Sequence, residues 1–250
     1  MDKHFFIEKK NDSLDFPFYN GKPKTINTAQ WAIILGILFI GFLISSFWDP
    51  NTSSSLAFLV IIVFSFMKLF FGVGSLALFA GKDAFLLFRK FKPKDLLFLA
   101  GILIVDFLYA GAAVVIVNLF DPAKANPAVV SSTQAHGLEL FLINTLSNIP
   151  NLLGEEFLAL LPFLAFLYFF YQRAHWSRNK SIAMALLLSS IIFGLLHLPT
   201  YQWNWLQVIF VIGLGRSIET AAYIRTKSIW ASFLVHFMFD TLAFLAGFLA

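Results

Sequence analysis

The chain has 250 residues, of which 59% are hydrophobic and 13% charged, and its mean hydropathy is +0.78. That leaves too little polar surface for a soluble globule of this size, so the sequence predicts an integral membrane protein. The net charge of +4 comes from basic residues beside the ends of apolar runs, which indicates membrane topology and no nucleic-acid partner. The absence of cysteine excludes disulfides and thiol chemistry.

The first 28 residues are polar and basic. They lack the apolar core and the small-residue cleavage site of a secretory signal, so we expect them to remain as a cytoplasmic tail. The rest of the chain, residues 29–250, is expected to form one membrane domain. Its apolar runs are about 18–25 residues long, which favours membrane-spanning helices over the shorter alternating strands of an outer-membrane barrel. The predicted fold class is therefore all-α, a polytopic transmembrane helical bundle of about seven spans.

The predicted spans follow one another with short loops between them. They cover about residues 30–48, 56–80, 96–120, 151–171, 181–198, 203–224 and 229–248. Loops at 81–95, 172–180 and 225–227 are basic, and the loops between them, including a turn at 49–54, are not. This alternation predicts a cytoplasmic amino terminus and an external carboxyl terminus.

Two prolines affect the predicted fourth span. Asn144, Asn148 and Pro150 interrupt the apolar sequence just before it, so we expect an interfacial elbow at 138–151 rather than a separate span. Pro162 lies within the span and should kink it, because proline removes one backbone hydrogen bond from the helix. The predicted elbow sets where the fourth span begins.

Ionisable residues inside the apolar runs are the candidate functional residues. Each carboxylate within a bilayer costs roughly 2.5–3.5 kcal/mol on insertion scales, so the adjacent Glu155 and Glu156 indicate a function. His197 and His236 lie in two other spans, and Asp240 follows His236 by one helical turn. The predicted topology places all five at similar depth, around a cavity that opens toward the outer face. Carboxylates and imidazoles together are suited to proton transfer.

Helical spacing divides these residues further. His236 and Asp240 are four residues apart and share one helix face, as do Phe193 and His197. Adjacent residues such as Glu155 and Glu156 point about 100° apart, so we expect one glutamate to act directly and the other to support it. Two further charged residues lie mid-span, Lys68 and Asp106. Because they are opposite in charge and on consecutive spans, we expect them to form a packing ion pair.

The pattern Glu155-Glu156, Phe193-x-x-x-His197 and His236-x-x-x-Asp240 resembles the motif set of the CPBP intramembrane glutamic endopeptidases. This family groups the type II CAAX prenyl endopeptidases with bacterial relatives linked to bacteriocin processing and self-immunity. The resemblance covers residues 151–248, which would form the catalytic core of an all-helical fold, and it implies a metal-free mechanism.

Residue roles also follow from the resemblance. It implies that Glu155 is the general base that activates water with the help of His197, and that His236 and Asp240 stabilise the oxyanion. Because an ionised carboxylate would repel an oxyanion, we expect Asp240 to act by orienting His236. Glu156 would then have a supporting role, as would Phe193.

One position departs from the family pattern. The family has arginine four residues after the second glutamate, where this chain has Leu160. Without that cation we expect Glu156 to be neutral and to donate a hydrogen bond, and catalytic activity is in doubt. Arg216 is a candidate replacement. A local ion pair with Glu219, three residues away, is the favoured interpretation of both.

A zinc site is the alternative to metal-free chemistry. Glu155, His197 and His236 are a plausible ligand set, and zinc would generate hydroxide without a tuned glutamate. These residues come from separate spans and lack the close spacing typical of many zinc sites. We therefore expect no cofactor and keep zinc as the alternative.

The predicted function is that of an intramembrane endopeptidase in the bacterial cytoplasmic membrane. It would cleave a membrane-associated peptide or protein with water activated by glutamate and histidine, in bacteriocin processing or self-immunity. Its expected partners are membrane lipid and that substrate. The outward cavity disfavours a prenylated CAAX substrate, which is made in the cytosol. Two alternatives stay open: a non-catalytic immunity protein that binds its target, and a proton-coupled transporter.

Overall fold

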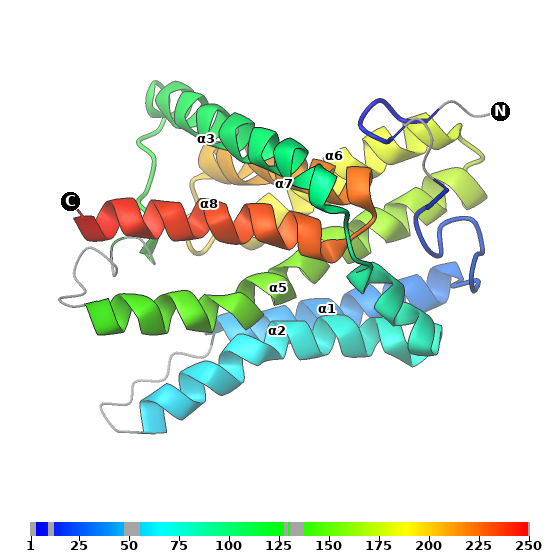
Figure 1. Ribbon diagram of the computed structural model, residues 1–250, viewed down its shortest axis with the longest axis horizontal. Helices are drawn as coiled ribbons and strands as arrows, with labels where there is room; N and C mark the ends of the chain where they lie inside the picture. The colour runs from blue at the N-terminus through cyan, green and yellow to red at the C-terminus, as the bar shows by residue number, and fades with distance from the viewer. Residues whose placement is uncertain (1–3, 10–12, 48–55, 128–129, 131–137, 250) are drawn as a thin grey trace.

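The computed structural model describes residues 4–9, 13–47, 56–127, 130 and 138–249 (Figure 1). All regular secondary structure in these ranges is helical, which confirms the predicted all-α class. The α-helices are α1 (Thr28–Phe47), α2 (Leu56–Ala80), α3 (Leu96–Asn118), α5 (Leu138–Tyr168), α6 (Arg178–Leu196), α7 (Leu214–Thr226) and α8 (Ile229–Leu249). Shorter 3₁₀ or π segments are η1 (Gly81–Phe88), η2 (Pro93–Asp95), η3 (Phe169–Arg173) and η4 (Gln207–Gly213). The turn predicted at 49–54 lies outside the described residues.

Six helical segments in the described chain are long and apolar enough to cross a membrane. Helices form here because hydrocarbon offers the backbone no other hydrogen-bond partner. The exception is the predicted span at 203–224, where α7 has only 13 residues and carries both Arg216 and Glu219. Together η4 and α7 cover Gln207 to Thr226, which is roughly 30 Å at 1.5 Å per residue. The two chain ends lie at opposite ends of the bundle (Figure 1).

Helix α5 is the centre of the bundle. In its membrane-length segment 89% of the residues are buried by other protein, against 17–39% in the other five segments. At Gly154 it approaches α2 so closely that an added Cβ would lie 2.5 Å from Lys68 Cβ and 2.6 Å from the Leu69 backbone nitrogen. A Cβ added at Gly72 of α2 would similarly lie 2.6 Å from Phe157 Cβ. The backbones of α2 and α5 therefore meet beside the two glutamates.

The predicted elbow at 138–151 is wrong. Residues Leu138 to Tyr168 form one helix of 31 residues that contains both Pro150 and Pro162. Pro150 removes one hydrogen bond without ending the helix, and the ribbon of α5 bends along its length (Figure 1). The membrane-length segment accordingly begins at Thr145, six residues before the predicted start.

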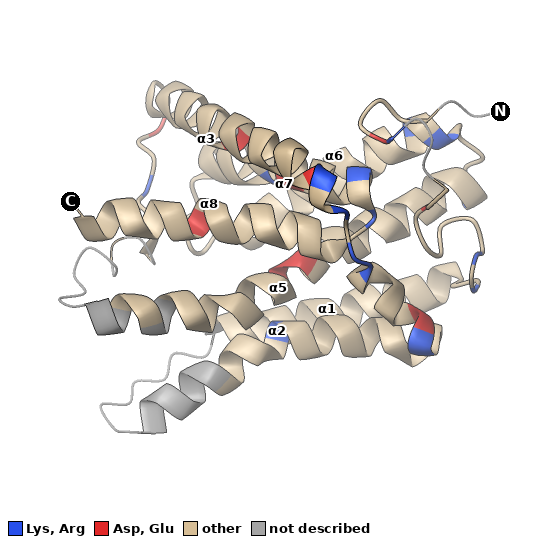
Figure 2. Cartoon of the chain, in the orientation of Figure 1, with Lys and Arg blue, Asp and Glu red and all other residues tan. Residues whose placement is uncertain are grey.

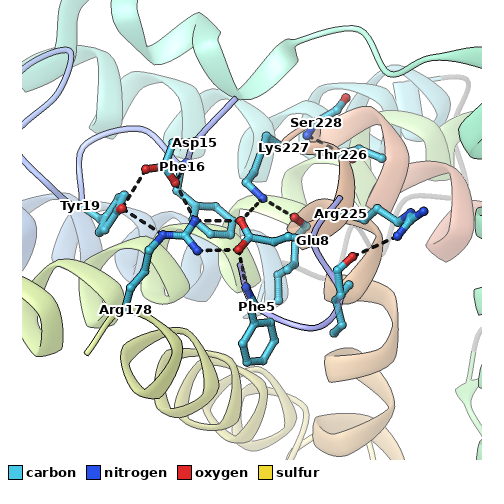
Figure 3. Close-up of polar contacts among 12 residues, drawn as sticks. Phe5, Glu8, Asp15, Phe16, Tyr19, Arg178, Arg225, Thr226, Lys227 and Ser228 are labelled. Carbon is cyan, nitrogen blue, oxygen red and sulfur yellow. Dashed lines mark hydrogen bonds and ion pairs between the residues drawn. The ribbon is translucent and has the colours of Figure 1, made fainter. Parts of the chain in front are cut away.

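The segment before α1 packs against the bundle. Phe16, Phe18, Tyr19 and Ile26 are at most 2% exposed and belong to the main hydrophobic core. Figure 3 shows the polar contacts of this segment, which we call the amino-terminal clamp: residues 5–9 and 13–19 together with Arg178 and Lys227. The sequence predicted a polar tail from its charges, but its aromatic residues supply the packing.

Buried Glu8 is the centre of the amino-terminal clamp. Arg178 Nη2 donates to Glu8 Oε1 at 2.8 Å, and Lys227 Nζ donates to the same oxygen at 2.6 Å (Figure 3). Arg178 Nη2 also contacts Asp15 Oδ1 at 2.7 Å. The clamp thus joins the start of the chain to the start of α6 and the end of α7.

Candidate functional site

A cavity of about 640 Å³ lies among the helices. All six membrane-length helices of the described chain contribute residues to its wall. Charged residues occur in the middle of α2, α3, α5 and α8, where the surrounding residues are apolar (Figure 2). The ionisable side chains that line the cavity are Lys68, Asp106, Lys124, Glu155, His197, Arg216, Glu219, His236 and Asp240. The four predicted catalytic residues, Glu155, His197, His236 and Asp240, are therefore brought to one cavity, together with Phe193.

Glu155 has a different partner on each carboxylate oxygen. Lys68 Nζ donates to Oε1 at 2.7 Å, and Asn151 Nδ2 lies 3.3 Å from the same atom. Oε2 faces His197 Nε2 at 4.0 Å. Only 8% of Glu155 is exposed, so these partners and the cavity make up its surroundings. One oxygen of Glu155 is fixed by the protein and the other is directed toward an imidazole.

The ring of His197 is oriented by the end of α6. His197 is the first residue after that helix, and its Nδ1 lies 2.8 Å from the Phe193 carbonyl oxygen, which accepts hydrogen bonds only. Nδ1 therefore carries the proton and Nε2 faces Glu155 as an acceptor in the neutral ring. Phe193 also packs against the ring, with centroids 4.7 Å apart. The Phe193-x-x-x-His197 spacing thus serves to hold the imidazole.

Glu156 is completely buried and points away from Glu155, as the expected 100° separation requires. Arg216 Nη2 lies 2.6 Å from its Oε2, and His236 Nδ1 lies 3.0 Å from its Oε1. The expectation of a neutral Glu156 without a cationic partner is therefore wrong. The sequence could not reveal this contact, because it joins residues 60 positions apart on different helices.

Arg216 has more than one partner. It forms the ion pair with Glu219 that the three-residue spacing predicted, and its Nη1 also lies 3.0 Å from His236 Nδ1. Its guanidinium stacks over Phe193 at 4.9 Å from the ring centroid. Leu160, by contrast, is fully buried in the hydrophobic core. The cation beside Glu156 therefore comes from α7 rather than from the next turn of α5.

His236 is oriented by Glu156 rather than by Asp240. Its Nε2 lies 3.9 Å from Asp240 Oδ2, beyond hydrogen-bond distance, whereas Nδ1 is within 3.0 Å of Glu156. The predicted orienting role of Asp240 is thus corrected, since the closer carboxylate is that of the second glutamate. His236 and Asp240 both line the cavity.

The predicted ion pair between Lys68 and Asp106 is also wrong. Lys68 pairs with Glu155, whereas the buried Asp106 lies beside Glu219. The reason is the packing order: α2 packs against α1 and α5, and α3 packs against α7 and α8. Helices α2 and α3 follow one another in the sequence, but each packs mainly against other helices of the bundle.

Among the described residues, one group has the geometry to hold a metal ion. Glu156, Glu219 and His236 offer ligand atoms within 4.8 Å of one another and are all buried. This differs from the predicted zinc ligands Glu155, His197 and His236, of which it shares only His236. The guanidinium of Arg216 contacts all three residues of the group and supplies a positive charge there. Zinc therefore stays an alternative prediction, with a different ligand set favoured by the geometry.

Comparison with known proteins supports the resemblance drawn from the motifs. A family model described as type II CAAX prenyl endopeptidase Rce1-like matches residues 137–242. No curated protein and no solved structure matches the chain. The matched segment begins at the start of α5 and includes α6, α7 and most of α8, so it contains every predicted catalytic residue.

Proposed function

We propose that this chain, whose residues 137–242 match the family model described as type II CAAX prenyl endopeptidase Rce1-like, hydrolyses a peptide bond of a membrane-associated peptide or protein. The observation that carries the proposal is the placement of Glu155 and His197. Their facing atoms are 4.0 Å apart on the wall of a cavity that His236 and Asp240 also line.

The spacing of Glu155 Oε2 and His197 Nε2 suits one water molecule. Two acceptors 4.0 Å apart can each lie about 2.8 Å from the same water oxygen, which then donates one hydrogen to each. In the proposed step the water oxygen attacks the peptide carbonyl carbon while Glu155 takes a proton. That proton passes to the departing amine when the carbon–nitrogen bond breaks. Glu155 is thus the base and then the proton donor, and His197 positions the water.

His236 is suited to stabilise the oxyanion. The residue lines the cavity, and its Nδ1 lies 3.0 Å from both Glu156 Oε1 and Arg216 Nη1, which leaves Nε2 as the ring nitrogen available to donate to an oxyanion. A preorganised donor to an oxyanion is typically worth about 2.7–4 kcal/mol. Because Arg216 stands beside Glu156, the replacement of the family arginine by Leu160 does not leave this glutamate without a cation. This contact supports a catalytic protein over a binding-only one.

The substrate class follows from the direction of the cavity. Its lining includes Lys124, Pro199 and Trp203, which follow α3 and α6 at the ends away from the amino-terminal clamp. The basic loops at 81–95 and 172–180 lie at the other ends of these helices, which favours an outward opening. We therefore propose an exported peptide as substrate, in bacteriocin processing or self-immunity, and place the protein in a bacterial cytoplasmic membrane.

The test compares membranes that contain wild type or Glu155→Gln protein. Peptides left uncleaved are identified by mass spectrometry, and cleavage by the variant should fall by about 10²–10⁴-fold, the usual contribution of a general base. Asp83→Asn is the matched control, because this carboxylate lies on η1 outside the cavity. Wild-type cleavage by a folded Glu155→Gln protein contradicts the proposal, and unaltered immunity without cleavage favours the binding protein.

A further inference from the structure

Lys68 lies within the apolar middle of α2 and is outside the matched family segment. Its ammonium group contacts Glu155 Oε1 at 2.7 Å and lies 5.6 Å from the centroid of the Phe42 ring. The side chain is 12% exposed and lines the cavity. A lysine at this depth is costly without a function, and its charged partner here is the proposed catalytic base.

The position of Lys68 is determined by the packing of two helices. Gly154 precedes Glu155, and its missing side chain allows the α2 backbone to approach at Lys68 and Leu69. A Cβ on residue 154 would lie 2.5 Å from Lys68 Cβ, so the two helices meet at this level of the bundle. The ion pair between Lys68 and Glu155 therefore lies at a close approach of α2 and α5, and the packing of these two helices fixes where the ammonium group can reach.

The other charged groups near Glu155 have different contacts. His197 from α6 faces the second oxygen, and His236 and Asp240 from α8 line the far side of the cavity. Arg216 from α7 is committed to Glu156 and Glu219. Within the described part of the chain, two basic groups have a nitrogen within 4.0 Å of a Glu155 oxygen: Lys68 at 2.7 Å and His197 at 4.0 Å.

We propose that Lys68 is a positioning residue for Glu155: its ammonium group holds Oε1, so that Oε2 is the oxygen presented to His197 and the cavity. This inference rests on the proposed function, because the role matters only if Oε2 accepts the proton of water. Without Lys68, Asn151 at 3.3 Å is the remaining contact of Oε1, and the carboxylate rotates more freely. The adjacent positive charge also favours the ionised carboxylate, which is the form able to act as a base.

The experiment replaces Lys68 with methionine, which keeps the length and removes the charge. We expect kcat to fall by about 10–100-fold with little change in KM, since a misplaced catalytic group costs up to about 10²-fold. The acidic limb of the pH–rate profile should move to higher pH, because the cation that favours the charged base is gone. Lys68→Arg keeps the charge and should restore the position of that limb.

Lys124→Met is the matched control. Lys124 lines the same cavity, but its hydrogen bonds to Gln207 run through its backbone, so this variant removes a cavity lysine without touching Glu155. If Lys68→Met and Lys124→Met give the same pH–rate profile as wild type, the positioning role is refuted. If both shift it equally, general cavity charge replaces the local contact as the explanation.

A second measurement does not depend on catalysis. Infrared spectroscopy detects the neutral carboxyl group of Glu155, assigned by its loss in Glu155→Gln, and in Lys68→Met this signal should appear at a pH about 1–3 units higher than in wild type. An unchanged signal overturns the proposal even if the enzyme is active. A shifted signal in a protein that cleaves no peptide supports the contact and instead counts against the proposed function.

Discussion

The buried side chain of Arg216 contacts three ionisable residues, each on a different helix. Its guanidinium reaches Glu156 on α5, His236 on α8 and Glu219 on its own helix, and it is 2% exposed. A buried charge of this kind is tolerated only where partners surround it, and removing one partner leaves the others uncompensated. The position of Arg216, rather than residue 160, therefore carries the electrostatic role beside the second glutamate.

Replacing Arg216 with methionine should destabilise the protein by about 3–5 kcal/mol, because Glu156 and Glu219 would keep buried charges without their cation. Thermal unfolding in detergent measures this loss of stability, and the control Arg173→Met, at an exposed arginine, should unfold like wild type.

The double variant Arg216→Met with Leu160→Arg returns a cation one helical turn from Glu156. We expect the double variant to recover part of the peptide cleavage that the single variant Arg216→Met loses. That recovery would show that the cation beside Glu156 can come from either position. Equal unfolding of Arg216→Met and wild type would contradict the assignment.

At the scale of elements, the contact between α2 and α5 connects packing to the site. The two helices approach each other closely at Gly154 and Gly72, and Lys68 and Glu155 lie beside the first of these glycines. Interhelical approach in membranes depends on small residues, since lipid supplies no hydrophobic force between helices. A change in this contact should alter stability and the ion pair together.

Gly154→Ala places a methyl group 2.6 Å from the Leu69 backbone nitrogen, where a flexible side chain is not available to move aside. We expect destabilisation of about 1–3 kcal/mol and a decrease in peptide cleavage, because α2 carries Lys68 away from Glu155. The control is Gly74→Ala on the partner helix α2, where an added Cβ meets nothing within 4 Å. Thermal unfolding and cleavage are measured for both. If the two alanine variants behave alike, the close approach has no energetic importance.

Patterns within one helix supplied part of the site, although the four-residue spacing of His236 and Asp240 did not give the orienting contact that was predicted from it. Hydropathy predicted the helices. The three-residue spacing predicted that Arg216 pairs with Glu219, and the four-residue spacing predicted that Phe193 supports His197. The same spacing relates Asn151 to Glu155, a contact that could have been foreseen. Partners on different helices were not accessible in this way. Lys68 was paired with Asp106 by chain order, whereas the bundle places α2 against α5 and α3 against α7.

At the scale of the whole molecule, the cavity and the amino-terminal clamp lie toward opposite ends of the bundle. Loop residues Lys124, Pro199 and Trp203 line the cavity at the end away from the amino-terminal clamp, and the clamp joins the start of the chain to the beginning of α6 and the end of α7. Burial of Glu8 acts to raise its pKa, but the hydrogen bonds from Arg178 and the charge of Lys227 outweigh it and lower the pKa to about 2. The ionised form of Glu8 is thus favoured by folding.

This depressed pKa predicts how stability changes with pH. Its unfolded value is 4.5, so the contribution of Glu8 is complete above about pH 4.5 and is lost as the pH falls toward 2. The full contribution is on the order of 3 kcal/mol at 1.36 kcal/mol per unit. Unfolding of wild type and Glu8→Gln in detergent should differ at pH 7 and converge in acid. A constant difference between them across this range would show that the carboxylate charge is not the source.

The amino-terminal clamp also has a consequence for biosynthesis. Glu8 is separated from Arg178 by 170 residues and from Lys227 by 219, so the start of the chain leaves the ribosome long before its two basic partners exist. At about 5–20 residues per second the delay is roughly 10–40 s. During that interval the first helices enter the bilayer before Glu8 can bind its partners. The amino-terminal clamp forms only after Arg178 and Lys227 have been synthesised.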